Sequence, residues 1–154
     1  MKQKVLAMLM AIALCVTCIG SVDFETKAQD MGEDISFSEL TTENALVGVM
    51  ESQTWGVYLL DGYSIINKIS STKIGAGGTT TAARKCKVTT SAIVERLSGG
   101  SWLRVTSWTT TVESGFSASV SKSLTVTTGY NYRVRCLHYA GSDYSSSFTS
   151  NLYM

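Results

Sequence analysis

The chain has 154 residues, a formal net charge of +1 and a hydrophobic fraction of 44%. This length suits one domain with a single core, and the near-neutral charge argues against nucleic acid as a partner. Proline is absent, whereas Ser, Thr and Gly are abundant. Because threonine repeatedly stands beside valine and tyrosine, and such side chains fit a pleated surface, the composition predicts strands rather than helices.

The first 28 residues have the pattern of a secretory signal peptide. Lys2 and Lys4 precede an apolar run over residues 5–19, and Thr26 and Ala28 supply the small residues of a cleavage site. A retained transmembrane anchor is the rival interpretation, but about 15 apolar residues fall short of the ~20 that span a bilayer. We therefore expect export, with no stable membrane anchor after cleavage.

Charge divides the remaining chain into two parts. Residues 29–63 contain seven acidic side chains and no Lys or Arg, whereas residues 73–154 contain nine basic and three acidic ones, a net charge of nine minus three, or +6. Residues 29–54 are predicted to be an acidic flexible segment, either a solvated linker or a mask over the basic domain. A short helix capped by Thr41 or Asn44 is only weakly indicated.

Residues 55–154 are predicted to form the domain, and its strands begin with two apolar runs on either side of Asp61–Gly62. This dipeptide favours a hairpin turn. Gly75, Gly77 and Gly78 follow. They resemble a phosphate-binding loop only superficially, because no Gly-Lys-Ser/Thr ending follows, so a bulged or edge strand with close backbone approach is expected.

Further strands are predicted at short, regular spacing. They cover residues 84–97 and, after a turn at 98–101, residues 102–112, where apolar residues on both parities indicate a central or bulged strand. Residues 113–115 are expected to end this strand. Residues 116–126 then alternate apolar and hydroxyl side chains, and residues 147–154 supply a last strand. This spacing is typical of a sandwich or barrel.

The strand after residue 131 shows the clearest alternation. Its inward set is predicted to be Val126, Tyr132, Val134, Cys136, His138 and Ala140. Its outward set is predicted to be Arg133, Arg135, Leu137 and Tyr139. The segment around Tyr132 resembles a fibronectin type III corner, which implies that the Tyr132 hydroxyl bonds back to the backbone, although Thr128 stands where that family has proline.

The cysteines suggest how two sheets are joined. Cys15 and Cys18 leave with the leader, which keeps Cys86 and Cys136, with Trp102 between them. This order resembles the immunoglobulin arrangement, in which a bridge pins two sheets against a buried indole. We expect an all-β, immunoglobulin-like antiparallel β-sandwich with a Cys86–Cys136 disulfide, the alternative being two reduced cysteines that pack as small hydrophobes.

Two stretches carry a wider resemblance. Residues 73–78 and 132–141, with the leader, are similar to a family of small secreted proteins from clostridia that is classified as a domain of unknown function. The resemblance implies secretion by a Gram-positive anaerobe, and it supplies no catalytic residues.

The sequence offers little chemistry. His138 is the lone histidine and is expected to be a core residue; with two cysteines it makes no zinc site, so no metal or cofactor is expected. A triad of His138 with a serine and Asp143 or Asp61 is not selected by any pattern. Glu95 and Glu113 form a formal carboxylate pair that surface residues explain equally well. We do not expect an enzyme.

A binding role has better support. Arg133 and Arg135 project outward from one strand and Lys85 and Lys87 from another, so neighbouring strands would give a basic stripe for an anionic polymer. In an immunoglobulin topology these two strands belong to opposite sheets, so the stripe would not form. The candidates for stacking on sugars are Tyr139, Tyr144, Trp108 and Tyr63, the alternative being aromatic residues of the core or of turns. The sequence therefore favours a non-catalytic module that binds a cell-wall polymer, a glycan or another protein. The alternatives are a released bacteriocin-like effector and, with less support, a hydrolase.

Overall fold

The computed structural model describes residues 32–50 and 56–154, and the predicted signal peptide lies outside them. The described chain is almost entirely strand, as the composition predicted. Its elements are β1 (Glu33–Asp34), α2 (Phe37–Leu40), β2 (Leu46–Val49), β3 (Leu59–Lys68), β4 (Lys73–Ser98), β5 (Ser101–Thr125), β6 (Asn131–Ala140), β7 (Asp143–Phe148) and β8 (Leu152–Tyr153).

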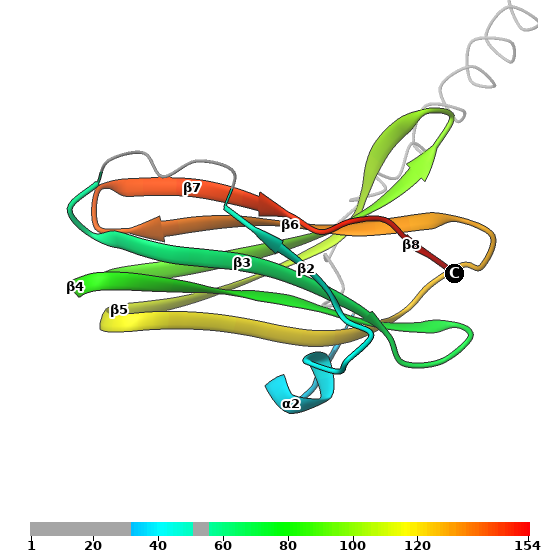
Figure 1. Cartoon of the computed structure of the whole chain (residues 1–154), viewed down its shortest axis with the longest axis horizontal. Helices are drawn as coiled ribbons and strands as arrows, with labels where there is room; N and C mark the ends of the chain where they lie inside the picture. The colour runs from blue at the N-terminus through cyan, green and yellow to red at the C-terminus, as the bar shows by residue number, and fades with distance from the viewer. Residues whose placement is uncertain (1–31, 51–55) are drawn as a thin grey trace, which may run out of the picture.

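Two long strands, β4 and β5, run through both layers of an antiparallel sandwich (Figure 1). The first half of β4 lies between β3 and the end of β5, and this layer continues to β2 and β1. The second half of β4 lies between β6 and the start of β5, and β6 also pairs with β7 and β8. A single bridge from Met50 to Ser147 joins β2 to β7. The predicted all-β sandwich is confirmed.

Irregular pairing marks the bend where β4 and β5 pass from one layer to the other. The β4–β5 register shifts on both sides of Cys86, which lies opposite Gly115. A bulge bends a strand and increases its twist without ending it, so β5 continues through residues 113–115, where the strand was predicted to end. The predicted hairpin at Asp61–Gly62 is also wrong, since both residues lie inside β3 beside another register shift.

The alternation predicted for β6 is confirmed. Its inward residues and Val126 are at most 7% exposed. The Tyr132 hydroxyl donates to the Thr127 carbonyl at 2.8 Å, as the corner resemblance implied. Gly78 and Gly62 make room for this row, because a Cβ at either position would overlap Cys136 or His138. The close backbone approach predicted for residues 75–78 is therefore present, although their strand is central rather than an edge.

The predicted disulfide is wrong, because Cys86 and Cys136 are both free. Cys136 pairs with Ala92, six residues beyond Cys86 along β4, so the two cysteines lie roughly 20 Å apart. A bridge requires Cα atoms within about 7 Å. Trp102 is not the buried indole either; Trp108 fills the core at 5% exposure. The immunoglobulin arrangement of Cys, Trp and Cys is not formed.

The acidic segment belongs to the domain over its described residues. β1 pairs with the end of β5, and β2 pairs with β3. Between them lies α2, with Ser36 as its N-cap. The side chains of Ser36 and Glu39 form a capping box, whereas Thr41 lies at the opposite end of the helix. Leu40 is fully buried. The prediction of a flexible tail is therefore wrong for residues 32–50, because these short elements pair with strands that are distant in sequence.

Candidate functional site

The outer face of the layer formed by β7, β6, β4 and β5 carries two exposed aromatic side chains. The strand registers place Tyr144, Tyr139, Thr89 and Thr111 side by side in one row across these four strands. Tyr139 is 42% exposed and Tyr144 66% exposed. Their rings stack with centroids 6.4 Å apart and an interplanar angle of 30°. We call these two residues the tyrosine pair.

Hydroxyl side chains continue the outer face beside the tyrosine pair. Thr89 Oγ1 and Thr111 Oγ1 are 2.9 Å apart, and Ser91 Oγ and Thr109 Oγ1 are 2.8 Å apart. A hydroxyl has one donor and two acceptor positions, so each hydrogen-bonded pair retains capacity for a further partner. The face therefore presents polar groups next to an aromatic surface.

An ion cluster lies at the end of the outer face opposite to the tyrosine pair. Arg133 Nε donates to Glu95 Oε2 at 2.7 Å, and Arg135 Nε lies 3.3 Å from Glu95 Oε1, an ion pair without hydrogen-bond geometry. The Arg133 guanidinium lies over the rings of Trp102, at 4.2 Å, and Phe148, at 5.1 Å. Because the Glu95 side chain is only 8% exposed, its interpretation as a surface acid is corrected.

The predicted basic stripe is not formed, although β4 and β6 are neighbours. Arg133 lies opposite Glu95, eight residues along β4 from Lys87, a separation of about 25 Å. Lys85 lies two residues further away, and Lys87 forms an ion pair with Glu113 at 3.0 Å. The structure therefore brings Tyr139 near Lys87 but keeps the two arginines apart from the two lysines.

The same register separates the two carboxylates that could have served glycoside hydrolysis. Glu113 is held beside Lys87 and Glu95 beside Arg133, at opposite ends of the outer face. Paired catalytic carboxylates lie roughly 5–9.5 Å apart. This is far less than the distance along β4 between Glu95 and Lys87, the partner of Glu113.

His138 is a core residue with both ring nitrogens engaged. It is fully buried, with Nδ1 2.8 Å from Thr80 Oγ1 and Nε2 2.8 Å from Ser147 Oγ. Burial lowers its pKa to about 4, against the opposing attraction of Asp61. Asp143 accepts the Tyr58 backbone N–H at 2.6 Å, and bonds of this kind lower its pKa. The Asp143 carboxylate therefore holds the backbone just before β3.

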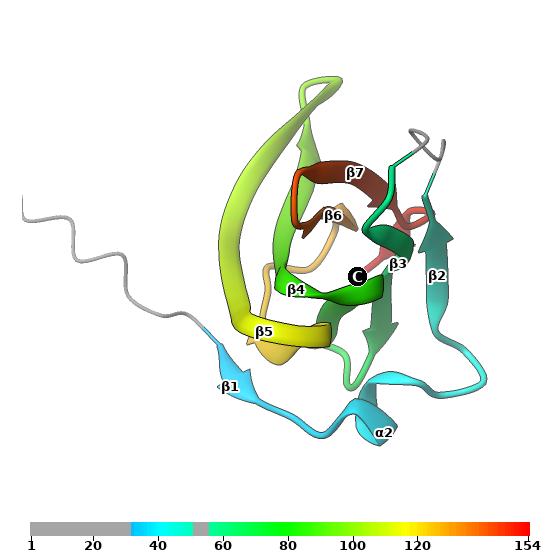
Figure 2. The same ribbon diagram turned by 90° about the vertical axis from the view of Figure 1, so that its left-hand side faces the viewer.

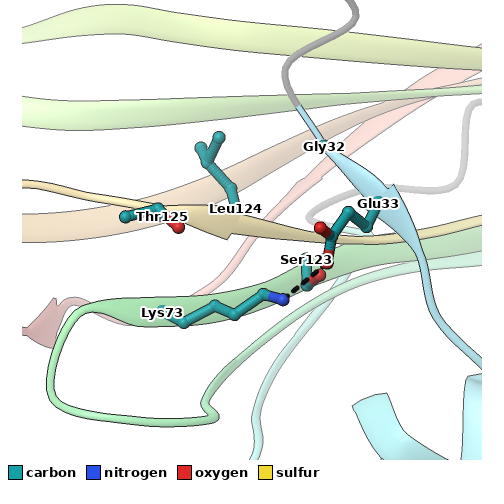
Figure 3. Close-up of a pocket in the computed structure, with 6 residues that line it drawn as sticks. All are labelled: Gly32, Glu33, Lys73, Ser123, Leu124 and Thr125. Atoms are coloured by element: carbon teal, nitrogen blue, oxygen red, sulfur yellow. Dashed lines mark hydrogen bonds and ion pairs between the residues drawn. The ribbon is translucent and has the colours of Figure 1, made fainter.

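A small hollow beside β1 is a second candidate. It encloses about 270 Å³ and is lined by Gly32, Glu33, Lys73, Ser123, Leu124 and Thr125. Figure 3 shows that Lys73 and Glu33 join across it, with Nζ and Oε2 2.7 Å apart. Because its two charged groups satisfy each other, the hollow is the weaker candidate.

Neither a metal site nor a membrane span is found among residues 32–50 and 56–154. In these ranges no three His, Cys, Asp or Glu side chains are grouped to hold a metal ion. No helix there has the length and apolar character needed to cross a bilayer.

Comparisons with known proteins add little. The chain matches no family model and no curated protein. Among solved structures it is similar to the solution structure of CsgH from R. palustris, with 14% sequence identity and a TM-score of 0.36; the match covers 66% of this chain and 87% of that chain. A likeness at this level assigns no function. The resemblance to the clostridial family stays a prediction.

Proposed function

We propose that this protein is a secreted, non-catalytic module that binds a glycan on the outer face of its β7–β6–β4–β5 layer. The tyrosine pair carries the proposal. Two stacked and exposed rings on a pleated face offer an apolar surface for a sugar ring, and each phenol adds a polar tip for its hydroxyls. The pairs formed by Thr89 with Thr111 and Ser91 with Thr109 supply further hydrogen-bonding groups.

Charge pairing favours a neutral glycan over an anionic polymer. Arg133 and Arg135 share the Glu95 carboxylate, and Lys87 faces Glu113. Of the basic residues predicted to bind an anion, three already have an acidic partner. Arg133 and Arg135 share one carboxylate, and Arg104 lies opposite it across the β4–β5 ladder, so this end of the face keeps a small positive excess. That excess is weaker than the field that the predicted four-residue stripe would have supplied. Secretion rests on the pattern of the leader.

Co-sedimentation of the mature protein with cellulose, chitin and purified peptidoglycan, at low and high salt, tests the proposal. We expect retention on at least one of these polymers that persists at high salt, because ring stacking is not screened. Tyr139→Ala should weaken the retained affinity about tenfold, as for an aromatic anchor, and Tyr139→Phe should keep most of it.

Tyr153→Ala is the matched control, because Tyr153 is 64% exposed but lies on β8, away from the tyrosine pair. Equal losses for Tyr139→Ala and Tyr153→Ala would contradict a site centred on the tyrosine pair. Retention that disappears at high salt would instead favour an anionic wall polymer. Absence of retention, together with growth inhibition of a neighbouring strain, would favour the released effector.

A further inference from the structure

Over most of its length, one side of β5 is not paired with any strand of residues 32–50 and 56–154. Among the described residues, β5 pairs with β4 on one side and, on the other, only with β1 at Lys122 and Ser123, with one further backbone bond from Ile35 to Ser121. In Figure 2, β5 forms the left-hand rim of the sandwich, and β1 lies beside its lower end. Over residues 101–120, alternate backbone N–H and C=O groups therefore face away from β4.

Between its two bulges, this edge lacks the charges and proline that keep exposed strands from pairing. The chain contains no proline, and residues 105–112 carry no charge and consist of Val, Thr, Ser and Trp. Natural proteins protect such edges with charges, proline or a covering element. An uncharged edge rich in β-branched residues is a template for a further strand.

We propose that this edge pairs with the same edge of a second copy, antiparallel about a twofold axis perpendicular to the sheet. This axis keeps the outer faces of both copies on the same side, so residues that lie opposite each other must belong to the same face. An axis at Thr109 meets the condition. Thr109 then lies opposite the partner's Thr109, and Ser107 opposite the partner's Thr111.

Charge complementarity selects this register. The β4–β5 ladder pairs Thr106 and Arg104 with consecutive residues of β4, so Val105 is an extra residue on β5. The extra residue brings the Arg104 side chain to the same face as Thr109. With Thr109 on the axis, Arg104 lies opposite the partner's Glu113, and the twofold symmetry forms this ion pair twice.

Both charged side chains are available for the contact. Arg104 is exposed, and its side chain donates to Ser107 Oγ within its own strand. Glu113 has a side chain that is 76% exposed in its pair with Lys87, which leaves its second carboxylate oxygen free for a further donor.

Pairing of this kind closes the assembly and extends the binding face. A twofold interface uses the edge of each copy once, so it yields a dimer rather than a fibre. The two outer faces become one continuous surface with a tyrosine pair at each end, which raises avidity for a long polymer. The dimer does not depend on the glycan proposal, because the edge pairs whether or not a ligand binds.

Sedimentation velocity of the purified mature protein over a range of micromolar concentrations tests the dimer. We expect a concentration-dependent dimer. Glu113→Arg and Arg104→Glu should each weaken dimerisation about tenfold or more, because like charges then face each other twice. The double variant R104E/E113R should restore dimerisation to near the wild-type level. Glu43→Arg, a charge reversal at an exposed loop residue, should have no effect.

Three results would overturn the proposal. These are a wild-type protein that stays monomeric at high micromolar concentration, single charge reversals that dimerise as well as the wild type, and a double variant no better than the single ones. Circular dichroism of each variant checks folding. Because this measurement contains no glycan, its failure leaves the test of the proposed function unaffected.

Discussion

At the scale of single residues, His138 joins the two layers of the sandwich. Its nitrogens contact Thr80 in the first half of β4 and Ser147 in β7. The hydroxyl of Thr90, in the second half of β4, continues the network by donating to the Ala118 carbonyl at 2.7 Å. These groups are fully buried, except for the Ala118 carbonyl, whose residue is 3% exposed. Buried polar groups require such partners, and a partly satisfied network is costly.

The lowered pKa of His138 predicts a stability that depends on pH. Its pKa is about 4 in the folded protein and 6.5 in the unfolded chain, so as pH falls the unfolded chain takes up the proton first. Stability is therefore fully present above pH 6.5 and is lost as pH falls toward 4. We expect the free energy of unfolding to fall by about 2 kcal/mol between pH 7 and pH 5.

Urea denaturation at a series of pH values measures this loss. His138→Gln, which cannot take up a proton, should be less stable than the wild type at pH 7 but nearly independent of pH between 7 and 5. A wild-type slope retained in that variant would assign the pH dependence to other groups.

At the scale of elements, the glycines of β4 set the distance between the layers. A Cβ on Gly78 would overlap the Tyr63 carbonyl and crowd Cys136 Sγ, whose thiol donates to the Gly77 carbonyl at 3.4 Å. β6 therefore packs directly against the backbone of β4. Gly100 plays a different role, since it turns the β4–β5 hairpin with a φ of +80°.

The two glycine roles predict different costs of substitution. Gly78→Ala should lower the free energy of unfolding by about 2–3 kcal/mol, because the layers must separate to accept the methyl group. Gly100→Ala meets no atom within 4 Å, so only the positive φ contributes, at about 1 kcal/mol. Denaturant titration of both variants measures the difference, and equal costs would contradict close packing at Gly78.

At the scale of the whole molecule, residues 32–50 extend one layer of the sandwich at both edges, with β1 beside β5 and β2 beside β3. Leu40 reaches Gly75 and Gly77 of β4. Asn67 holds α2 in place, because its amide donates to the Glu39 carbonyl at 2.8 Å while its oxygen accepts the Gly75 N–H at 3.1 Å. The acidic part of the chain is therefore attached to the basic part by packing and backbone hydrogen bonds as well as by charge.

This attachment predicts that Leu40 contributes to global stability. Leu40→Ala should lower the free energy of unfolding by about 2–5 kcal/mol, as expected for a fully buried leucine. Val47→Ala, at a position 54% exposed in β2, should cost less than about 1 kcal/mol. Thermal denaturation of both variants is the measurement. A Leu40→Ala variant as stable as the wild type would mean that the segment is not part of the core.

Local sequence pattern was sufficient to predict the strands in which every second residue faces the same side throughout. The inward row of β6, the turn at residues 98–101 and the tyrosine corner were all predictable, because period-two alternation and turn residues act over a few neighbours. Prediction failed at the bulges. Gly115 and Asp61 interrupt a pattern in the same way that a turn does, so the continuous strands β5 and β3 were each divided.

The candidate site was predictable only in part. Tyr139 and Tyr144 were both candidates for stacking on sugars, but only the β6–β7 register places them side by side. Trp108, another candidate, is buried in the core instead. The predicted stripe of Lys85, Lys87, Arg133 and Arg135 failed because sequence shows which face a side chain occupies but not its height along the neighbouring strand.

The sequence by itself determined the all-β class, the inward and outward faces of β6 and the core position of His138, because side-chain periodicity acts within one strand. Only the three-dimensional arrangement shows that Cys86 and Cys136 are far apart, that Arg133 and Arg135 share the Glu95 carboxylate, and that one edge of β5 stays open among the described residues. These features depend on register between strands distant in the chain, and register is set by bulges and long-range packing that no local pattern records.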